Sequence, residues 1–183
     1  MTLAEAKAAF QGLLLAEVRA RAEERLGRPL PESWLGEYER RRNAAFEGSL
    51  RPVAGAAALI EALREAGLQI CVASQGRRAK TDRSLELTGL DPLLGNEARF
   101  SAEQVPRGKP HPDLFLFAAA RMGFAPGASV VVEDTPSGVA AARAAGMRVF
   151  GYAAETEAGE LERNGAQTVT SLAELAPVLI GVG

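Results

Sequence analysis

The chain of 183 residues contains a single cysteine, Cys71, so no disulfide can form within it. This cysteine lies in the apolar run LQICVAS, where we expect a buried core thiol. No stretch reaches the roughly 18 apolar residues of a membrane span, and the first residues lack the pattern of a signal peptide. The net charge of −2 gives no reason to expect nucleic acid or an anionic membrane as partner. We therefore expect a cytoplasmic protein.

Lysine and aspartate are scarce as well. Of the 21 basic residues only Lys7, Lys80 and Lys109 are lysines, and of the 23 acidic residues only four are aspartates. Arginine and lysine are not interchangeable at a tight phosphate site. Lys109 and Asp134 are therefore candidates for positions that need a compact ammonium or a short carboxylate.

The pattern of the chain changes near Arg51 and Pro52. Residues 1–51 show three helical patterns, at 3–11, 13–26 and 31–46, the last with a proline at its start. After residue 52 helices alternate with short apolar strands. We expect helices at 55–66, 77–88, 112–122, 137–145 and 171–178, and strands at 68–73, 98–101, 129–133, 147–151 and near 168. Repeated βα units predict an α/β fold with a doubly wound parallel sheet in 52–183, preceded by an all-α unit in 1–51.

The segment VVVEDTPSG, Val130 to Gly138, is the most informative in the chain. Three β-branched residues in a row are typical of a fully buried parallel strand, and Glu133 and Asp134 follow where it ends. Adjacent carboxylates repel unless a cation lies between them, and Mg²⁺ prefers such hard oxygen ligands. A magnesium site is one interpretation. A helix N-cap acid beside a solvated neighbour is the other.

Two further polar segments follow predicted strands or connect them. Ser74 and Gln75 stand at the end of LQICVA, where a hydroxyl and the amides of a helix start favour an anion. In RGKPHPDLF, two prolines stiffen the backbone around Lys109, and Asp113 is placed to cap the next helix. His111, the only histidine, is expected to be a surface side chain.

These three segments, VASQGRR, RGKPHPDLF and VVVEDTPSGVAAARAAGM, resemble the second, third and fourth motifs of the haloacid dehalogenase (HAD) superfamily of hydrolases. The likeness is strongest to the subgroup with a helical cap, which includes sugar-phosphate and phosphoglycolate phosphatases and β-phosphoglucomutases. It implies an α/β core of Rossmann type in 52–183 and a small cap in 1–51.

The resemblance also implies roles for single residues. Ser74 and the backbone amide of Gln75 would bind the transferring phosphoryl group, and Lys109 would neutralise it. Asp134 would ligate Mg²⁺, with Glu133 beside it as a direct or water-mediated ligand. These roles suit phosphoryl transfer, which is catalysed chiefly by positioning and charge neutralisation.

One departure from the family is large. Its reaction passes through a phospho-aspartate on the first Asp of a D-x-D motif, whereas this sequence has no D-x-D and no Asp before Asp82. In the family that motif ends the central strand of the sheet, so we expect a slot between the strands at 68–73 and 129–133. Unpaired edges there would favour strand-completing self-association.

Three function classes remain open. The first is a Mg²⁺-dependent phosphatase of a small phosphorylated metabolite, whose nucleophile this chain does not supply. The second is a non-catalytic fragment or pseudoenzyme that binds phosphate or a partner chain. The third is a phosphoglucomutase-like mutase, which the sequence favours less because Leu13 follows Gly12 where mutases carry an arginine. We expect this exact chain to be inactive, and a response-regulator receiver is disfavoured by the GKPHPD loop.

Overall fold

The computed structural model describes residues 1–10 and 13–181 and forms two compact units, Met1–Arg51 and Pro52–Gly183. The first unit holds the helices α1 (Leu3–Phe10), α2 (Leu15–Leu26) and α3 (Trp34–Ser49). The sequence predicted all three. Residue 11, the last of the first predicted helix, lies outside the described residues. So does Gly12, which precedes the Leu13 that disfavours a mutase.

The start of α3 differs from the prediction. The helix begins at Trp34, whose N–H donates to the Pro31 carbonyl at 3.0 Å, so Pro31 precedes the helix and does not open it. Further along, Arg40 and Arg41 both pair with Glu37 and are 74% and 80% exposed. This face of α3 is therefore a solvated, ion-paired surface.

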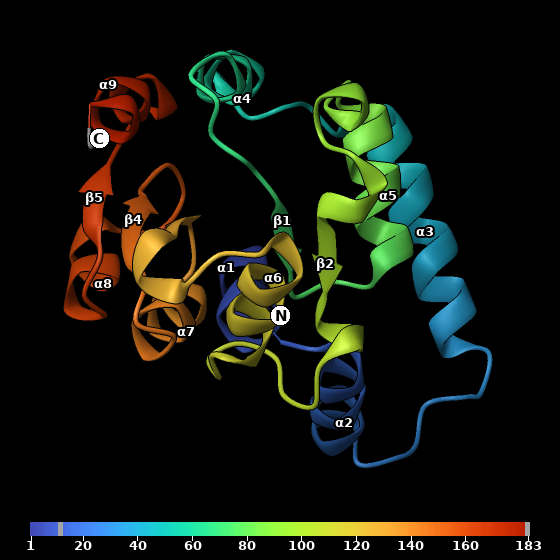
Figure 1. The fold of residues 1–183 in the computed structure, drawn as a ribbon. Helices are drawn as coiled ribbons and strands as arrows, with labels where there is room; N and C mark the ends of the chain where they lie inside the picture. The colour runs from blue at the N-terminus through green and yellow to red at the C-terminus, as the bar shows by residue number, and fades with distance from the viewer. Residues whose placement is uncertain (11–12, 182–183) are drawn as a thin grey trace. The chain divides into compact units, whose positions relative to one another are not determined.

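The second unit has the predicted alternation of helices and strands (Figure 1). Its strands are β1 (Val72–Ser74), β2 (Arg99–Ser101), β3 (Val130–Glu133), β4 (Arg148–Tyr152) and β5 (Gln167–Val169). Its helices are α4 (Ala56–Glu65), α5 (Arg78–Leu87), α6 (Asp113–Met122), α7 (Pro136–Ala144), α8 (Ala158–Arg163) and α9 (Leu175–Ile180). Short 3₁₀ turns join them, among them η1 (Asp91–Leu93) and η5 (Leu172–Glu174). The expected α/β fold is confirmed.

All strand pairs are parallel, but they form two sheets. β1 pairs with β2, with Ser74 opposite Ser101, and β3, β4 and β5 form a three-stranded sheet in that order. Within residues 1–10 and 13–181, β1 and β3 are not hydrogen-bonded to each other. Among these residues each of the two strands therefore has one edge without a partner strand, and a slot between them stays a prediction.

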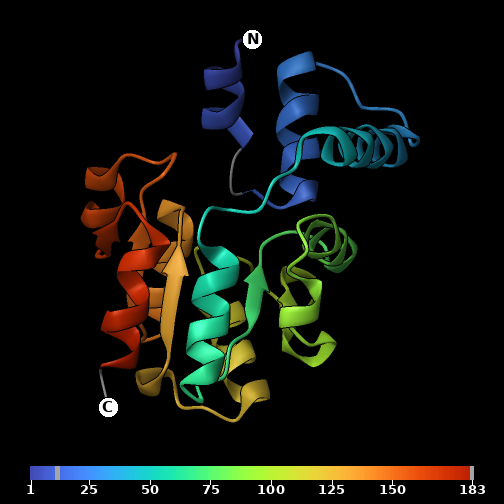
Figure 2. The ribbon, with the colours of Figure 1, turned by 90° about the horizontal axis from the view of Figure 1, so that it is seen from above.

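Two apolar layers cover the three-stranded sheet. On one face α6, α7 and α8 pack through Phe115, Val139 and Leu161 against Val131 and Val149 of the strands. On the other face α4 and α9 lie along the sheet (Figure 2) and meet Phe150 and Val169 through Leu59 and Leu175. The sheet is therefore held by a core on both sides.

Three expectations about burial and strand limits were wrong. Strand β3 is buried on one face only, since Val130 and Val132 are 43% and 40% exposed where the strand is an edge of its sheet. The first strand covers residues 72–74 and not 68–73, because pairing with β2 fixes its limits. Cys71 is only partly buried, and this burial raises the pKa of its thiol.

None of the helices in the described part of the chain has the length and apolar character to cross a bilayer.

Candidate active site

The turn after β3 folds around the carboxylate of Glu133. One oxygen of this carboxylate accepts hydrogen bonds from the N–H groups of Asp134 at 3.1 Å and Thr135 at 3.2 Å, and from the Thr135 hydroxyl at 2.9 Å. The Thr135 hydroxyl also caps α7 by accepting from the N–H of Gly138 at 3.1 Å, and Pro136 opens the helix. Glu133 is thus a buried carboxylate that holds the strand-to-helix turn.

Gly138 is required by this arrangement. A Cβ built on it would lie 2.0 Å from the carboxyl carbon of Glu133 and 2.2 and 2.3 Å from its oxygens. Any side chain at this position would displace the carboxylate. The close approach explains why a glycine follows the acids by a few residues.

Lys109 contacts the other oxygen of the same carboxylate. Its ammonium pairs with Oε1 of Glu133, and both side chains are buried, at 7% and 8% exposure. The ammonium also lies 4.7 Å from the ring centre of Phe115, a cation–π contact. The lysine therefore points into the molecule toward the acids, and its peptide bond to Pro110 is cis.

Gln75 connects the loop after β1 to Lys109. Its side-chain oxygen accepts from the Lys109 N–H at 2.9 Å, and its side-chain nitrogen donates to the Lys109 carbonyl at 3.4 Å. Gly108 makes this possible, since a Cβ there would lie 2.6 Å from the Gln75 amide nitrogen. From the sequence, only the backbone amide of Gln75 was predicted to have a role, in binding the phosphoryl group. The positioning of Lys109 by its side chain was missed, because a glutamine in a loop carries no signal for it.

Ser74 lies at the end of β1, in the loop of residues 74–77 that we call the Ser74 loop. Its hydroxyl accepts from the N–H of Gly76 at 3.1 Å, and the carbonyl of Gly76 accepts from the Ser101 hydroxyl at 3.0 Å. Ser101 is fully buried on β2. The loop is therefore held from both strands, and the hydroxyl hydrogen of Ser74 can still be donated to a ligand.

Asp134 differs from its neighbour Glu133. Its lost hydration raises the pKa of its carboxyl above the usual value, the charges of Glu133 and Glu155 add to the rise, and the charge of Lys109 opposes it. Although the residue as a whole is accessible to solvent, the carboxyl lies in a crowded position beside buried charges. Its backbone carbonyl accepts from the Thr156 hydroxyl at 2.6 Å, which brings the loop after β4 to this site. A bound cation would relieve the repulsion.

The donors present fit magnesium only in part. Among residues 1–10 and 13–181 no group of three or more His, Cys, Asp or Glu side chains is arranged to hold a metal. Mg²⁺ in enzymes is commonly held by one or two carboxylates, waters and substrate phosphate. Asp134 suits that kind of contact, whereas the lone pairs of Glu133 are largely occupied by Lys109 and the turn.

Two predicted details of the RGKPHPDLF loop have clear outcomes. Asp113 is the first residue of α6 but does not cap it; its carboxylate pairs with Arg107 at 2.9 and 3.0 Å. The guanidinium of Arg107 lowers the pKa of Asp113, although burial opposes this. His111 is exposed, as expected for a surface side chain.

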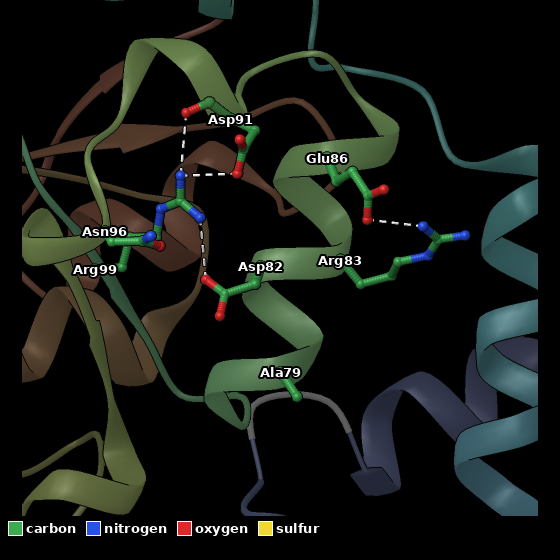
Figure 3. Close-up of a pocket in the computed structure, with 7 residues that line it drawn as sticks. All are labelled: Ala79, Asp82, Arg83, Glu86, Asp91, Asn96 and Arg99. Carbon is green, nitrogen blue, oxygen red and sulfur yellow. Dashed lines mark hydrogen bonds and ion pairs between the residues drawn. The ribbon is translucent and has the colours of Figure 1, made fainter.

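An open pocket of about 630 Å³ lies beside α5 and η1 and was not foreseen (Figure 3). Its floor is Arg99, which is 4% exposed and pairs with Asp82 at 3.2 Å and Asp91 at 2.8 Å. Arg99 also donates to the carbonyls of Asp91 and Leu94. This network links η1 to α5 and β2. It provides hydrogen-bond and ion-pair partners for the polar groups that line the pocket around Arg99.

The comparison with protein families agrees with the geometry of the site. The family model for haloacid dehalogenase-like hydrolases matches residues 3–146, so the chain belongs to this family.

The relatives of this chain include phosphatases and a phosphomutase. The chain is 36% identical over 107 residues to hexitol phosphatase A of Escherichia coli, covering 58% of this chain and 48% of that protein. It is 41% identical over 139 residues to a β-phosphoglucomutase of Mycobacterium tuberculosis, covering 71% and 49%. A HAD family hydrolase of Deinococcus radiodurans, crystallised with phosphate and sodium, is 34% identical with a TM-score of 0.77, covering 99% of this chain and 81% of that one. The chain thus spans about half the length of the two curated relatives.

Proposed function

We propose that this chain serves a Mg²⁺-dependent phosphatase of a small phosphorylated metabolite, of the sugar-phosphate or phosphoglycolate type. The reaction would pass through an aspartyl phosphate whose aspartate these residues do not supply. The observation that carries the proposal is the buried pair of Lys109 and Glu133, fixed to the Ser74 loop through Gln75. A buried lysine held at the ends of parallel strands is suited to neutralise a phosphoryl group.

Each residue has a separate task in this proposal. The Ser74 hydroxyl and the Gln75 backbone N–H would donate to phosphoryl oxygens, and Lys109 would balance their charge. Glu133 would hold the ammonium of Lys109 in place. Asp134 would hold Mg²⁺, which, when bound, supplies charge neutralisation of the phosphoryl oxygens.

Hydrolysis assays test the proposal. The chain alone, offered a panel of phosphorylated sugars and acids, is expected to show no turnover above background, because a positioned carboxylate nucleophile is required. The chain extended by an apolar strand ending in D-x-D is expected to hydrolyse members of the panel only with Mg²⁺. Changing the first Asp of that strand to Asn is the matched control. Phosphate binding without turnover by the extended chain would favour the pseudoenzyme alternative instead.

A phosphomutase is the second candidate, favoured by the 41% identity to a β-phosphoglucomutase. Leu13 disfavours a mutase, because it follows Gly12 where mutases carry an arginine. Phosphorus NMR of the extended chain with a hexose phosphate distinguishes the two: a phosphatase releases inorganic phosphate, and a mutase forms an isomeric hexose phosphate.

We further propose that the unpaired edges of β1 and β3 recruit a strand from another copy of the chain. Edge strands present rows of unpaired N–H and carbonyl groups that favour such association. Sedimentation at several protein concentrations tests this, and a monomer at all of them would contradict it.

A further inference from the structure

A second lysine lies over the Ser74 loop. Lys80 is on the first turn of α5, and its side chain folds back across Gly76. A Cβ built on Gly76 would lie 2.9 Å from Cδ and 3.5 Å from Nζ of Lys80, and 3.4 Å from the hydroxyl oxygen of Ser74. The ammonium and the hydroxyl thus flank one point of the loop, and the absence of a side chain on Gly76 gives the lysine its place.

The arginines before Lys80 are directed elsewhere. Arg77 pairs with Glu103 at 2.9 Å. Arg78 pairs with Asp82 at 2.8 Å and donates to the carbonyl of Arg99 at 2.9 Å. These contacts tie the start of α5 to β2 and to the turn after it. The charge that this part of the chain brings to Ser74 is therefore that of Lys80.

The charges of the site allow a further cation beside Ser74. Lys109 is paired with Glu133, and Asp134 adds a negative charge beside them. A phosphoryl group carries its charge on several oxygens, so a cation on the Ser74 side adds to the neutralisation that Lys109 and the Mg²⁺ proposed at Asp134 would supply. A compact ammonium next to Ser74, at the N-terminal end of a helix, can supply this charge.

We propose that Lys80 is a phosphate-binding residue, which contacts the same phosphoryl group as the Ser74 hydroxyl. This inference rests on the proposed function, since it needs phosphate to bind at Ser74. It assigns the loop a cation of its own, in addition to Lys109.

Binding of inorganic phosphate to the full chain tests the proposal. It is measured by phosphorus NMR titration in the presence of Mg²⁺. Lys80→Met keeps the length of the stem over Gly76 and removes the charge. We expect it to weaken binding about tenfold, the effect of losing one charge-assisted hydrogen bond. Lys80→Arg is expected to restore most of the affinity, and thermal unfolding of both variants checks that the fold is kept.

Arg83→Met is the matched control, because it removes one positive charge from the same helix about one turn further along. Its effect on phosphate binding should be less than twofold, since screening by salt weakens distant charges. Lys109→Met separates the two proposals. Phosphate binding that depends on Lys109 but not on Lys80 would overturn the role of Lys80 and leave the proposed function intact. Binding that is absent, or indifferent to Lys109, would overturn both.

Discussion

The two sheets of the second unit are held together by different forces. The sheet of β3, β4 and β5 lies between apolar clusters in which Phe150, Val139, Leu161 and Leu175 are fully buried. The sheet of β1 and β2 buries polar groups beside the apolar Phe100, among them Arg99 at 4% and Ser101 at 0% exposure. One half therefore derives its stability mainly from apolar burial, and the other depends strongly on satisfied hydrogen bonds and ion pairs.

This difference matches the tasks proposed for the two halves. The apolar half carries Glu133 and Asp134 at the end of a strand, whereas the Ser74 loop of the polar half is held by a hydrogen bond from Ser101 and by the hydrogen bonds between Gln75 and the backbone of Lys109. A loop held in this way can be misplaced without unfolding the protein. Substitutions in the apolar half should thus lower stability, and those in the polar half should mainly lower phosphate affinity.

The largest effect is expected from Phe150→Ala. Phe150 is fully buried between α4, α9 and the sheet, and removing such a ring costs about 3–5 kcal/mol of unfolding free energy. Ser101→Ala, at an equally buried position in the polar half, should cost about 1–2 kcal/mol, because the hydroxyl no longer donates to the Gly76 carbonyl or accepts from the Glu103 N–H. Urea unfolding of both variants measures the contrast. Equal losses would show that the two halves do not differ as described.

Gly138→Ala should affect both properties. The added methyl overlaps the Glu133 carboxylate, so that side chain must move and its contact with Lys109 is lost. We expect a loss of about 1–3 kcal/mol, as for other overpacked sites, together with phosphate binding too weak to measure. In Gly127→Ala the same change meets no atom within 4 Å, so stability and binding should remain. Unfolding and phosphate titrations check both, and retained binding in Gly138→Ala would contradict the assigned role of Glu133.

Gln75→Ala should weaken phosphate binding with little loss of stability. The two hydrogen bonds to the backbone of Lys109 disappear, while Lys109 still pairs with Glu133. A cost of about 1 kcal/mol corresponds to roughly fivefold weaker binding. Gln167→Ala, on the exposed start of β5, is the control and should change neither quantity. Unchanged affinity in Gln75→Ala would show that Lys109 keeps its position without this contact.

The sequence was sufficient for the features that depend on local pattern. Glycine and proline stops predicted most helices, because these residues act on the backbone directly. The limits of β1 could not be predicted from LQICVA, since partner β2 decides which residues pair. Helix α8 was missed because only Leu161 in it is fully buried, so its apolar period is weak.

The contacts within the candidate site were predictable to a smaller extent. Motif residues such as Lys109 and Asp134 stand out by type and spacing. The close approaches at Gly76, Gly108 and Gly138 depend on which side chain the fold brings across each glycine. Those partners come from other segments or from the next turn, and no local pattern encodes them.

The smallest expected effect is a difference in how acid destabilises the two sheets. Hydrogen bonds from Arg78 and Arg99 outweigh the burial of Asp82 and hold its pKa below the usual value of 3.8. A lowered pKa means that the ionised form stabilises the fold above the unfolded pKa, and that this stabilisation is lost as pH falls through the lower, folded pKa. Below about pH 4 the polar sheet should therefore loosen before the apolar one.

Amide hydrogen exchange measures this, with protection falling first in β2 and later in β4. Asp82→Asn removes the titrating group and should abolish this part of the pH dependence. The effect is small because Asp82 is 38% exposed, and simultaneous loss of protection in both strands would show that acid does not distinguish the two sheets.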